Sequence, residues 1–252
     1  MLHGASVPVD LIVGASAGAL IGALYAATRD PARTERVAMA FTSTDFLEWF
    51  LRDLRLSPRG GRMGCRLWQA CGRLDFRGLA VPFATVALDV GSGRPVLLRE
   101  GNVGRAVEAS IRPPLISRPV LLDGRALVDG GLHNALPVWV ARELGAQTVI
   151  SVDAGAPLVL PKALRPLSAR VGAAYRWHSA VPADVNGQIG FLAEMLSKGR
   201  PRRARADIEI RPSMPGISPM WPWHIGAAAR RGEAAARRAL PAIRRLLAAP
   251  SA

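Results

Sequence analysis

Ser16 lies at the centre of a Gly-x-Ser-x-Gly pattern whose outer glycines are Gly14 and Gly18. A strand that turns sharply into a helix can present such a serine hydroxyl at the tip of the turn. The two glycines lack a Cβ atom and would let the strand and the helix approach each other. The N–H group of Ala17 would then face an oxygen that becomes negative during acyl transfer. The pattern predicts a nucleophilic serine with Ala17 as an oxyanion donor; the alternative is a serine that only caps the helix.

A serine is a weak nucleophile without a base, and the candidate base is Asp129. Two glycines follow it, Gly130 and Gly131, and they allow the backbone to turn sharply beside another element. Residues 121–128 contain an Asp-Gly turn between two apolar runs, which predicts a β-hairpin with Asp129 at its end. In α/β folds, strand ends that face a crevice carry the chemistry. The alternative is an ordinary loop aspartate.

A histidine could extend this pair to a triad. His133 follows Asp129 by four residues, so the chain order Ser, Asp, His is satisfied. In a triad the acid orients one imidazole nitrogen while the other reaches the serine, and so short a spacing makes that geometry awkward. We therefore interpret His133, like His178 and His224, as a surface or packing residue. No Cys and His cluster has metal-ligand spacing, and we expect neither a metal nor a cofactor.

The segment around Ser16 must first be distinguished from a membrane span. Leu11 to Thr28 is uncharged over 18 residues, the lower limit for a transmembrane helix, with glycines at four-residue steps. However, Val9–Val13 is β-branched and predicts a short buried strand. A helix over 17–27 would be about 16 Å long, too short for a bilayer. We therefore predict a strand, a turn and a helix.

The other elements expected near the site alternate between strands and helices. Strands over 85–89 and 96–99 would form a hairpin, and Asn102 would cap the next helix. A helix over 137–144 would lead into a strand over 148–152. This alternation predicts a three-layer α/β domain with an antiparallel hairpin on the Asp129 side.

Two apolar stretches are candidates for lipid contact. Residues 31–56 carry large apolar side chains at helical spacing and predict an amphipathic helix, either a lid or part of the core; these side chains are Phe41, Phe46, Trp49, Phe50 and Leu54. Met220–Trp223 is either an aromatic membrane-interface segment or a packed loop.

Basic residues outnumber acidic ones by 33 to 19, which gives a net charge of +14. Residues 198–245 alone contain twelve basic and three acidic residues. Arginine pairs recur every seven residues in the last predicted helix, on nearly one face, and Pro241 is expected to break or kink that helix; the pairs are Arg230/Arg231, Arg237/Arg238 and Arg244/Arg245. Such a stripe suits anionic lipid headgroups, whereas no nucleic-acid motif accompanies it. The alternative is a compositional bias toward arginine.

Several segments together resemble the patatin-like lipid acyl hydrolases, a phospholipase family, and particularly their short bacterial members. The similar segments are the serine block (7–20), the segment ahead of the aspartate (109–114), the Asp-Gly-Gly block (128–138), the following strand (149–153) and a C-terminal stretch (208–218). The resemblance implies an α/β fold, a three-layer α/β/α domain related to the α/β-hydrolases, with a mostly parallel central sheet. It implies one domain over 1–252, with the core in 7–153 and peripheral helices, including the basic one, in 154–252.

The resemblance also implies an activity. A Ser16–Asp129 dyad without histidine would hydrolyse lipid acyl esters (phospholipid, lysophospholipid or acylglycerol) through an acyl-enzyme. The chain has only two cysteines, Cys65 and Cys71, which cannot make a disulfide framework. This and the basic stripe fit a cytoplasmic protein at the periphery of an anionic membrane. Family members carry a glycine-rich strand and loop before the serine block, so we expect this chain to be N-terminally truncated. The alternative is a catalytically impaired lipid- or partner-binding protein without a complete oxyanion hole.

Overall fold

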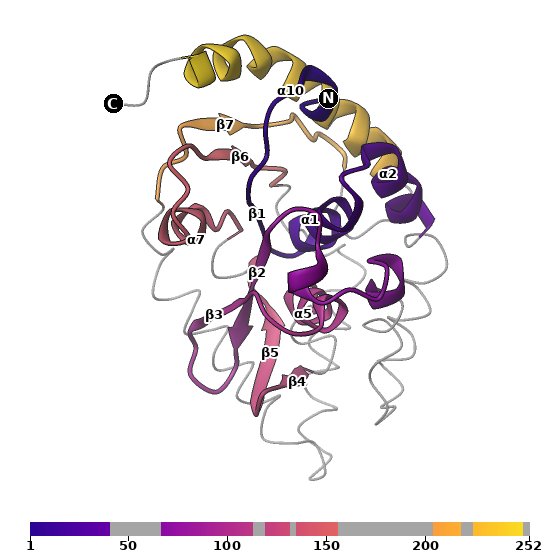
Figure 1. Cartoon of the computed structure of the whole chain (residues 1–252), viewed down its shortest axis with the longest axis vertical. Coiled ribbons are helices and arrows are strands. Elements are labelled where there is room, and N and C mark those ends of the chain that lie inside the picture. The colour runs from indigo at the N-terminus through magenta and orange to yellow at the C-terminus, as the bar shows by residue number, and fades with distance from the viewer. Residues whose placement is uncertain (41–66, 113–118, 132–134, 156–203, 218–223, 249–252) are drawn as a thin grey trace.

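The computed structural model describes residues 1–40, 67–112, 119–131, 135–155, 204–217 and 224–248 (Figure 1). The predicted helix within 31–56 is described only as far as residue 40, and its large apolar residues lie outside the described part. His133, His178 and the whole aromatic segment at 220–223 also lie outside the described residues.

The central element is β2 (Phe83–Asp89), whose residues are buried except the last. It pairs in parallel with β1 (Ile12–Gly14) and antiparallel with β3 (Pro95–Leu98) and β5 (Arg125–Asp129), and β5 pairs antiparallel with β4 (Val120–Leu122). Both predicted hairpins are present. The sheet in the described residues is therefore mixed, which corrects the expectation of a mostly parallel sheet. The reason is that short turns can join only antiparallel neighbours, and two such hairpins supply most of the strands.

β1 and β5 lie on the same edge of β2. Gly14 of β1 pairs with Thr85, Asp129 of β5 pairs with Ala87, and β3 pairs with both Thr85 and Ala87. Because a strand has only two edges, β1 and β5 both lie opposite β3. β1 runs parallel and β5 antiparallel to β2, so their carboxyl ends approach each other and stop on either side of Val86.

Helices cover both faces of this sheet. α1 (Ala17–Thr28) and α5 (Val103–Ser110) contact each other and share a core with Ile12 of β1. The next residue of β1, Val13, packs instead with α7 (Val138–Glu143). Neighbouring residues of a strand point to opposite faces, so α7 lies on the other side of the sheet. Asn102 caps α5 as predicted, accepting a hydrogen bond from the Arg105 amide at 2.9 Å.

The predicted strand, turn and helix at Leu11–Thr28 are confirmed by β1 and α1. α2 (Pro31–Ala40) packs on α1, and two short 3-10 helices cover His3–Ala5 and Phe76–Gly78. Within the described part of the chain, no helix combines the length and the apolar character needed to cross a bilayer.

A second group of elements lies beside the first. β6 (Ile150–Val152) pairs in parallel with β7 (Ile208–Ile210), and α10 (Ile225–Ala248) packs on β7 (Figure 1). α10 continues through Pro241, which corrects the prediction that this proline breaks the helix. Ala235 and Ile243, one before and one after the proline, are both buried in the same apolar cluster, and this packing holds the two halves together.

Candidate active site

Ser16 occupies the turn between β1 and α1. Its backbone has φ 54° and ψ −128°, a conformation that non-glycine residues rarely adopt and that costs about 1–3 kcal/mol. The side chain makes no capping hydrogen bond to α1, so the helix-cap alternative does not describe it. The serine is partly exposed, and Ala17 and Gly18 beyond it are exposed, which leaves this end of the helix open to the surface.

The Ser16 hydroxyl points to Asp129, which is 113 positions away in the chain. Its Oγ donates a hydrogen bond to Asp129 Oδ2 at 2.7 Å, and the Gly131 amide donates to Oδ1 at 2.7 Å. Burial raises the pKa of Asp129 to about 6, while the hydrogen bonds from Ser16 and Gly131 act in the opposite direction. The carboxylate is thus ionised at neutral pH, yet it is a stronger base than an exposed aspartate.

Two of the four motif glycines are required by close backbone contacts. A Cβ atom on Gly14 would lie 2.4 Å from the carbonyl oxygen of Gly18, and one on Gly130 would lie 2.3 Å from the carbonyl oxygen of Val86. The strand and the helix thus approach closely between Gly14 and Gly18, as expected, but a Cβ atom on Gly18 itself would meet no atom within 4 Å, so only Gly14 needs to be glycine for this contact. At Gly131 the nearest atom would be Asp129 Oδ1, at 3.0 Å.

Ala17 is the first residue of α1. The next two amides of this turn already have acceptors, because Gly18 donates to the Ala15 carbonyl and Ala19 to the Ser16 carbonyl, each at 2.9 Å. The Ala17 amide has no acceptor four residues earlier within the helix, as is usual for a first helical residue. Ala17 directly follows Ser16 and is exposed, which places its amide beside the serine at the open end of the site. The positive end of the helix dipole lies at the same point.

Sequence reasoning assigned no role to Ser110, the last residue of α5. Its Oγ accepts a hydrogen bond from the Ser16 amide at 3.1 Å and donates one to the Val86 carbonyl at 2.8 Å. The residue is fully buried. A serine in the last turn of a helix carries no local signal of such contacts; the similarity of 109–114 to a family block was the only pointer. On the other side of the turn, Thr85 Oγ1 donates to the Gly14 carbonyl at 3.0 Å.

The end of α5 also supports Asp129. The Asp129 amide donates to the carbonyl of Arg112 at 2.8 Å. The guanidinium of Arg112 forms a buried ion pair with Glu108, which also accepts a hydrogen bond from Arg105 at 2.8 Å. A buried charge pair with several hydrogen bonds is costly to disrupt, so it fixes this segment firmly.

The described histidines lie elsewhere in the chain. His3 Nδ1 is 2.9 Å from the Tyr25 hydroxyl, and His224 precedes α10. His133, the candidate third member of a triad, lies outside the described residues. Among the residues that the structure describes, no group of three or more His, Cys, Asp or Glu could hold a metal ion.

Comparison with known proteins places this geometry in context. Residues 1–142, which include Ser16 and Asp129, match the family described as patatin-like phospholipase. The chain is 36% identical over 165 residues to Patatin-like phospholipase domain-containing protein 6 of Mus musculus, covering 61% of this chain and 12% of that protein. It is 27% identical over 154 residues to Lysophospholipase NTE1 of Mycosarcoma maydis, covering 59% of this chain and 8% of that protein.

A bacterial relative is an uncharacterized NTE family protein of Mycobacterium tuberculosis, 33% identical over 150 residues. That alignment covers 59% of this chain and 26% of the mycobacterial protein. The chain therefore spans only a minor part of the length of these relatives.

Proposed function

The chain belongs to the patatin-like phospholipase family, and on this premise we propose that it is a serine hydrolase that cleaves lipid acyl esters with Ser16 and Asp129. The observation that carries the proposal is the 2.7 Å hydrogen bond from Ser16 Oγ to Asp129 Oδ2. Two segments far apart in sequence bring a hydroxyl and a base together, and the hydroxyl sits at a strained turn that opens to the surface.

In the proposed first step, Ser16 Oγ attacks the ester carbonyl carbon while its proton passes to Asp129. The carbonyl oxygen becomes an oxyanion, and the amide of Ala17 donates a hydrogen bond to it. As the tetrahedral intermediate collapses, the C–O bond of the ester breaks and Asp129 returns the proton to the departing alcohol oxygen. The acyl group remains on Ser16.

In the second step, a water molecule attacks the acyl carbon and transfers a proton to Asp129. The bond to Ser16 breaks, the serine oxygen recovers the proton and the fatty acid leaves. One residue thus serves as base and acid in turn. A pKa of about 6 suits this double role, because Asp129 binds a proton more readily than an exposed aspartate and is still ionised at pH 7.

The proposed substrates are phospholipids, lysophospholipids and acylglycerols. The support is the family description and the printed name of the fungal relative, a lysophospholipase. All three substrates present the same acyl ester to Ser16, so the headgroup must be distinguished by direct assay of each class.

A fluorophosphonate probe tests the nucleophile, because such probes react with activated serines. We expect labelling at Ser16, located by mass spectrometry, and hydrolysis of a short-chain ester. Ser16→Ala should abolish the labelling, and Ser16→Ala and Asp129→Asn should each lower the hydrolysis rate by about 10³-fold or more. Asp123→Asn, the same change at an exposed turn residue, is the matched control. A Ser16→Ala variant that keeps more than about a tenth of the wild-type rate refutes the mechanism, and a wild-type protein with neither labelling nor hydrolysis favours the non-catalytic lipid- or partner-binding alternative.

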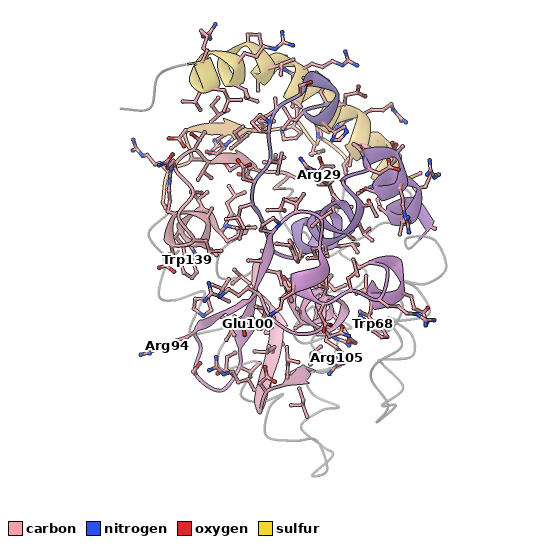
Figure 2. The ribbon with its side chains drawn as sticks, in the orientation of Figure 1. Arg29, Trp68, Arg94, Glu100, Arg105 and Trp139 are labelled. Atoms are coloured by element: carbon pink, nitrogen blue, oxygen red, sulfur yellow. The ribbon has the colours of Figure 1, made fainter. Side chains whose placement is uncertain are left out.

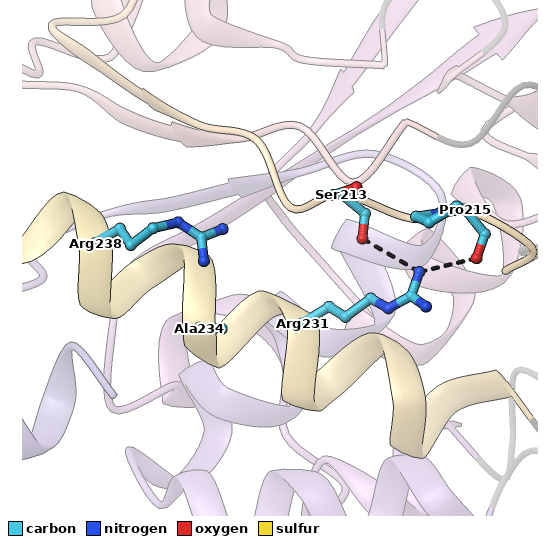
Figure 3. A pocket seen from close by; sticks show the side chains of 5 residues that line it. All are labelled: Ser213, Pro215, Arg231, Ala234 and Arg238. Carbon is cyan, nitrogen blue, oxygen red and sulfur yellow. Dashed lines mark hydrogen bonds between the residues drawn. The ribbon is translucent and has the colours of Figure 1, made fainter.

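We further propose that α10 contacts anionic lipid. Arg230, Arg244 and Arg245 are exposed, and nitrogen-tipped side chains project outward from this helix (Figure 2). Arg231 is instead turned inward and donates to the carbonyl oxygens of Ser213 and Pro215, in the segment before the helix (Figure 3). Arg238 lines the same hollow as these three residues. The outer face of α10 therefore carries an excess of positive charge that complements an anionic bilayer.

Vesicle co-sedimentation tests this contact. We expect binding to vesicles that contain phosphatidylserine, weak binding to pure phosphatidylcholine, and loss of binding when Arg244 and Arg245 are replaced by Glu. Replacing two exposed arginines outside α10, Arg77 and Arg94, by Glu makes the same change in net charge and is the control. Equal binding to both vesicle types would refute the proposal, and tight salt-dependent retention on DNA in its absence would favour a nucleic acid as the partner.

A further inference from the structure

The hydroxyl of Ser110 connects the backbone of Ser16 to the central strand. It accepts a hydrogen bond from the Ser16 amide at 3.1 Å and donates one to the Val86 carbonyl at 2.8 Å. An amide can only donate and a carbonyl can only accept, so the single hydroxyl proton must point to Val86. Because Ser110 is fully buried, neither contact is exchanged with bulk water.

The position of Val86 explains why a side chain is needed here. The pairing of β1 with β2 ends at Thr85, and the pairing of β5 begins at Ala87. Val86 therefore faces the junction between two strand ends. Gly130 packs directly against its carbonyl oxygen, where even a Cβ atom would not fit. A hydroxyl from α5 supplies a donor at this junction, as buried carbonyl groups require.

The same hydroxyl acts on a strained residue. Ser16 has φ 54°, and such a conformation persists only where the surroundings hold it. The hydrogen bond from its amide to Ser110 fixes the orientation of the peptide group between Ala15 and Ser16. The direction of the Ser16 side chain follows from that backbone, and it points Oγ toward Asp129.

We propose that Ser110 is a positioning residue: it holds the Ser16 backbone in the conformation that directs the hydroxyl to Asp129. The proposal rests on the proposed function, in which Ser16 is the nucleophile. Ser110 is buried behind the turn and acts only through Ser16 and Val86, so it does not touch substrate.

Ser110→Ala tests this role. We expect kcat for a short-chain ester, and the rate constant for fluorophosphonate labelling of Ser16, to fall by about 10- to 100-fold, because the Ser16 amide loses the acceptor that orients it. KM should stay within about twofold. The pH midpoint of kcat/KM should not move, because Ser110 has no contact with the Asp129 carboxylate among its hydrogen bonds in the described residues.

Two further variants separate positioning from stability. Thr34→Val removes another buried hydroxyl, which lies in α2 and donates to the carbonyl of Asp30, just before that helix, at 2.8 Å. This change should lower the melting temperature without changing kcat. Ser110→Thr keeps the hydroxyl and should restore most of the rate. If Ser110→Ala does not fold, Ser110→Cys, which has a similar size and a weaker hydrogen bond, takes its place under the same criterion.

The possible failures are distinct. A folded Ser110→Ala or Ser110→Cys protein with kcat and labelling within twofold of wild type would overturn the positioning role while leaving Ser16 as the nucleophile. A wild-type protein that the probe does not label at Ser16 would overturn the proposed function, and the positioning role with it.

Discussion

The ends of β1 and β5 meet at the same point of the sheet, but they present their functional groups differently. Asp129 is the last residue of β5 and still pairs with Ala87, so the sheet itself fixes its backbone. Ser16 has already left β1 and lies in a turn with φ 54°. The comparison shows that the carboxylate is placed by regular structure, whereas the hydroxyl depends on a strained turn that other residues must hold.

The residues that hold the backbones of Ser16 and Asp129 come from one segment, at the carboxyl end of α5. Ser110 binds the amide of Ser16, and two residues later the Arg112 carbonyl binds the amide of Asp129. The buried pair of Arg112 with Glu108 ties this segment to α5. A single helix end therefore sets the relative position of the proposed nucleophile and base, although it contributes neither.

The largest expected effect tests whether the two ends work as one unit. Ser16→Ala and Asp129→Asn should each reduce kcat/KM by about 10³-fold or more, and the double variant should be no slower than the slower single variant, because neither group acts without the other. Steady-state kinetics on a short-chain ester measure all three. Multiplicative losses in the double variant would show that the two residues act independently.

The second prediction concerns the close backbone contacts of Gly14, at the end of β1, and of Gly130, just after β5. Gly14→Ala and Gly130→Ala should each lower the free energy of unfolding by about 3 kcal/mol, because the added methyl group meets backbone oxygen atoms. Gly18→Ala should be neutral or stabilise α1 by up to about 1 kcal/mol, since space is open there. Urea denaturation measures the difference. Equal losses of unfolding free energy in Gly14→Ala and Gly18→Ala would contradict the contacts described for this turn.

The local parts of the site could be predicted from the sequence. Asn102 caps a helix, and Asp123 and Gly124 form a hairpin turn with φ 49° and 73°, because these residue types favour such conformations wherever they occur. The same local signals place Asp129 at a strand end and Ser16 between a strand and a helix. Each prediction depended on neighbouring residues alone.

The arrangement of these parts could not be predicted in the same way. That β1 and β5 share one edge of β2 depends on pairing between segments about 70 and 40 residues apart, and no local pattern encodes it. The mixed character of the sheet and the role of Ser110 follow from that pairing. Gly18 shows the converse, because its place in a motif suggested that glycine is required there, whereas a Cβ atom at this position would meet no atom within 4 Å.

The third prediction concerns the burial of Asp129, at the carboxyl end of β5. Burial raises the pKa of Asp129 to about 6, and only the ionised form can accept the Ser16 proton. kcat/KM for a neutral ester should therefore be constant above pH 7 and fall about tenfold per unit below pH 6. The pH profile of wild type between 4.5 and 8 measures this. A midpoint near 4 would mean that the carboxylate is as well hydrated as an exposed aspartate.

The smallest effect distinguishes the two side chains that hold the turn at Ser16, those of Thr85 and Ser110. Thr85→Val removes a buried hydrogen bond to the Gly14 carbonyl with almost no change in shape, and should cost about 1 kcal/mol of stability. Because Gly14 lies two residues before Ser16 and still pairs within the sheet, labelling of Ser16 should slow by less than threefold, well below the loss expected for Ser110→Ala. Fluorophosphonate kinetics on both variants measure the contrast. If Thr85→Val slowed labelling as strongly as Ser110→Ala, the turn would be held from β2 rather than from α5.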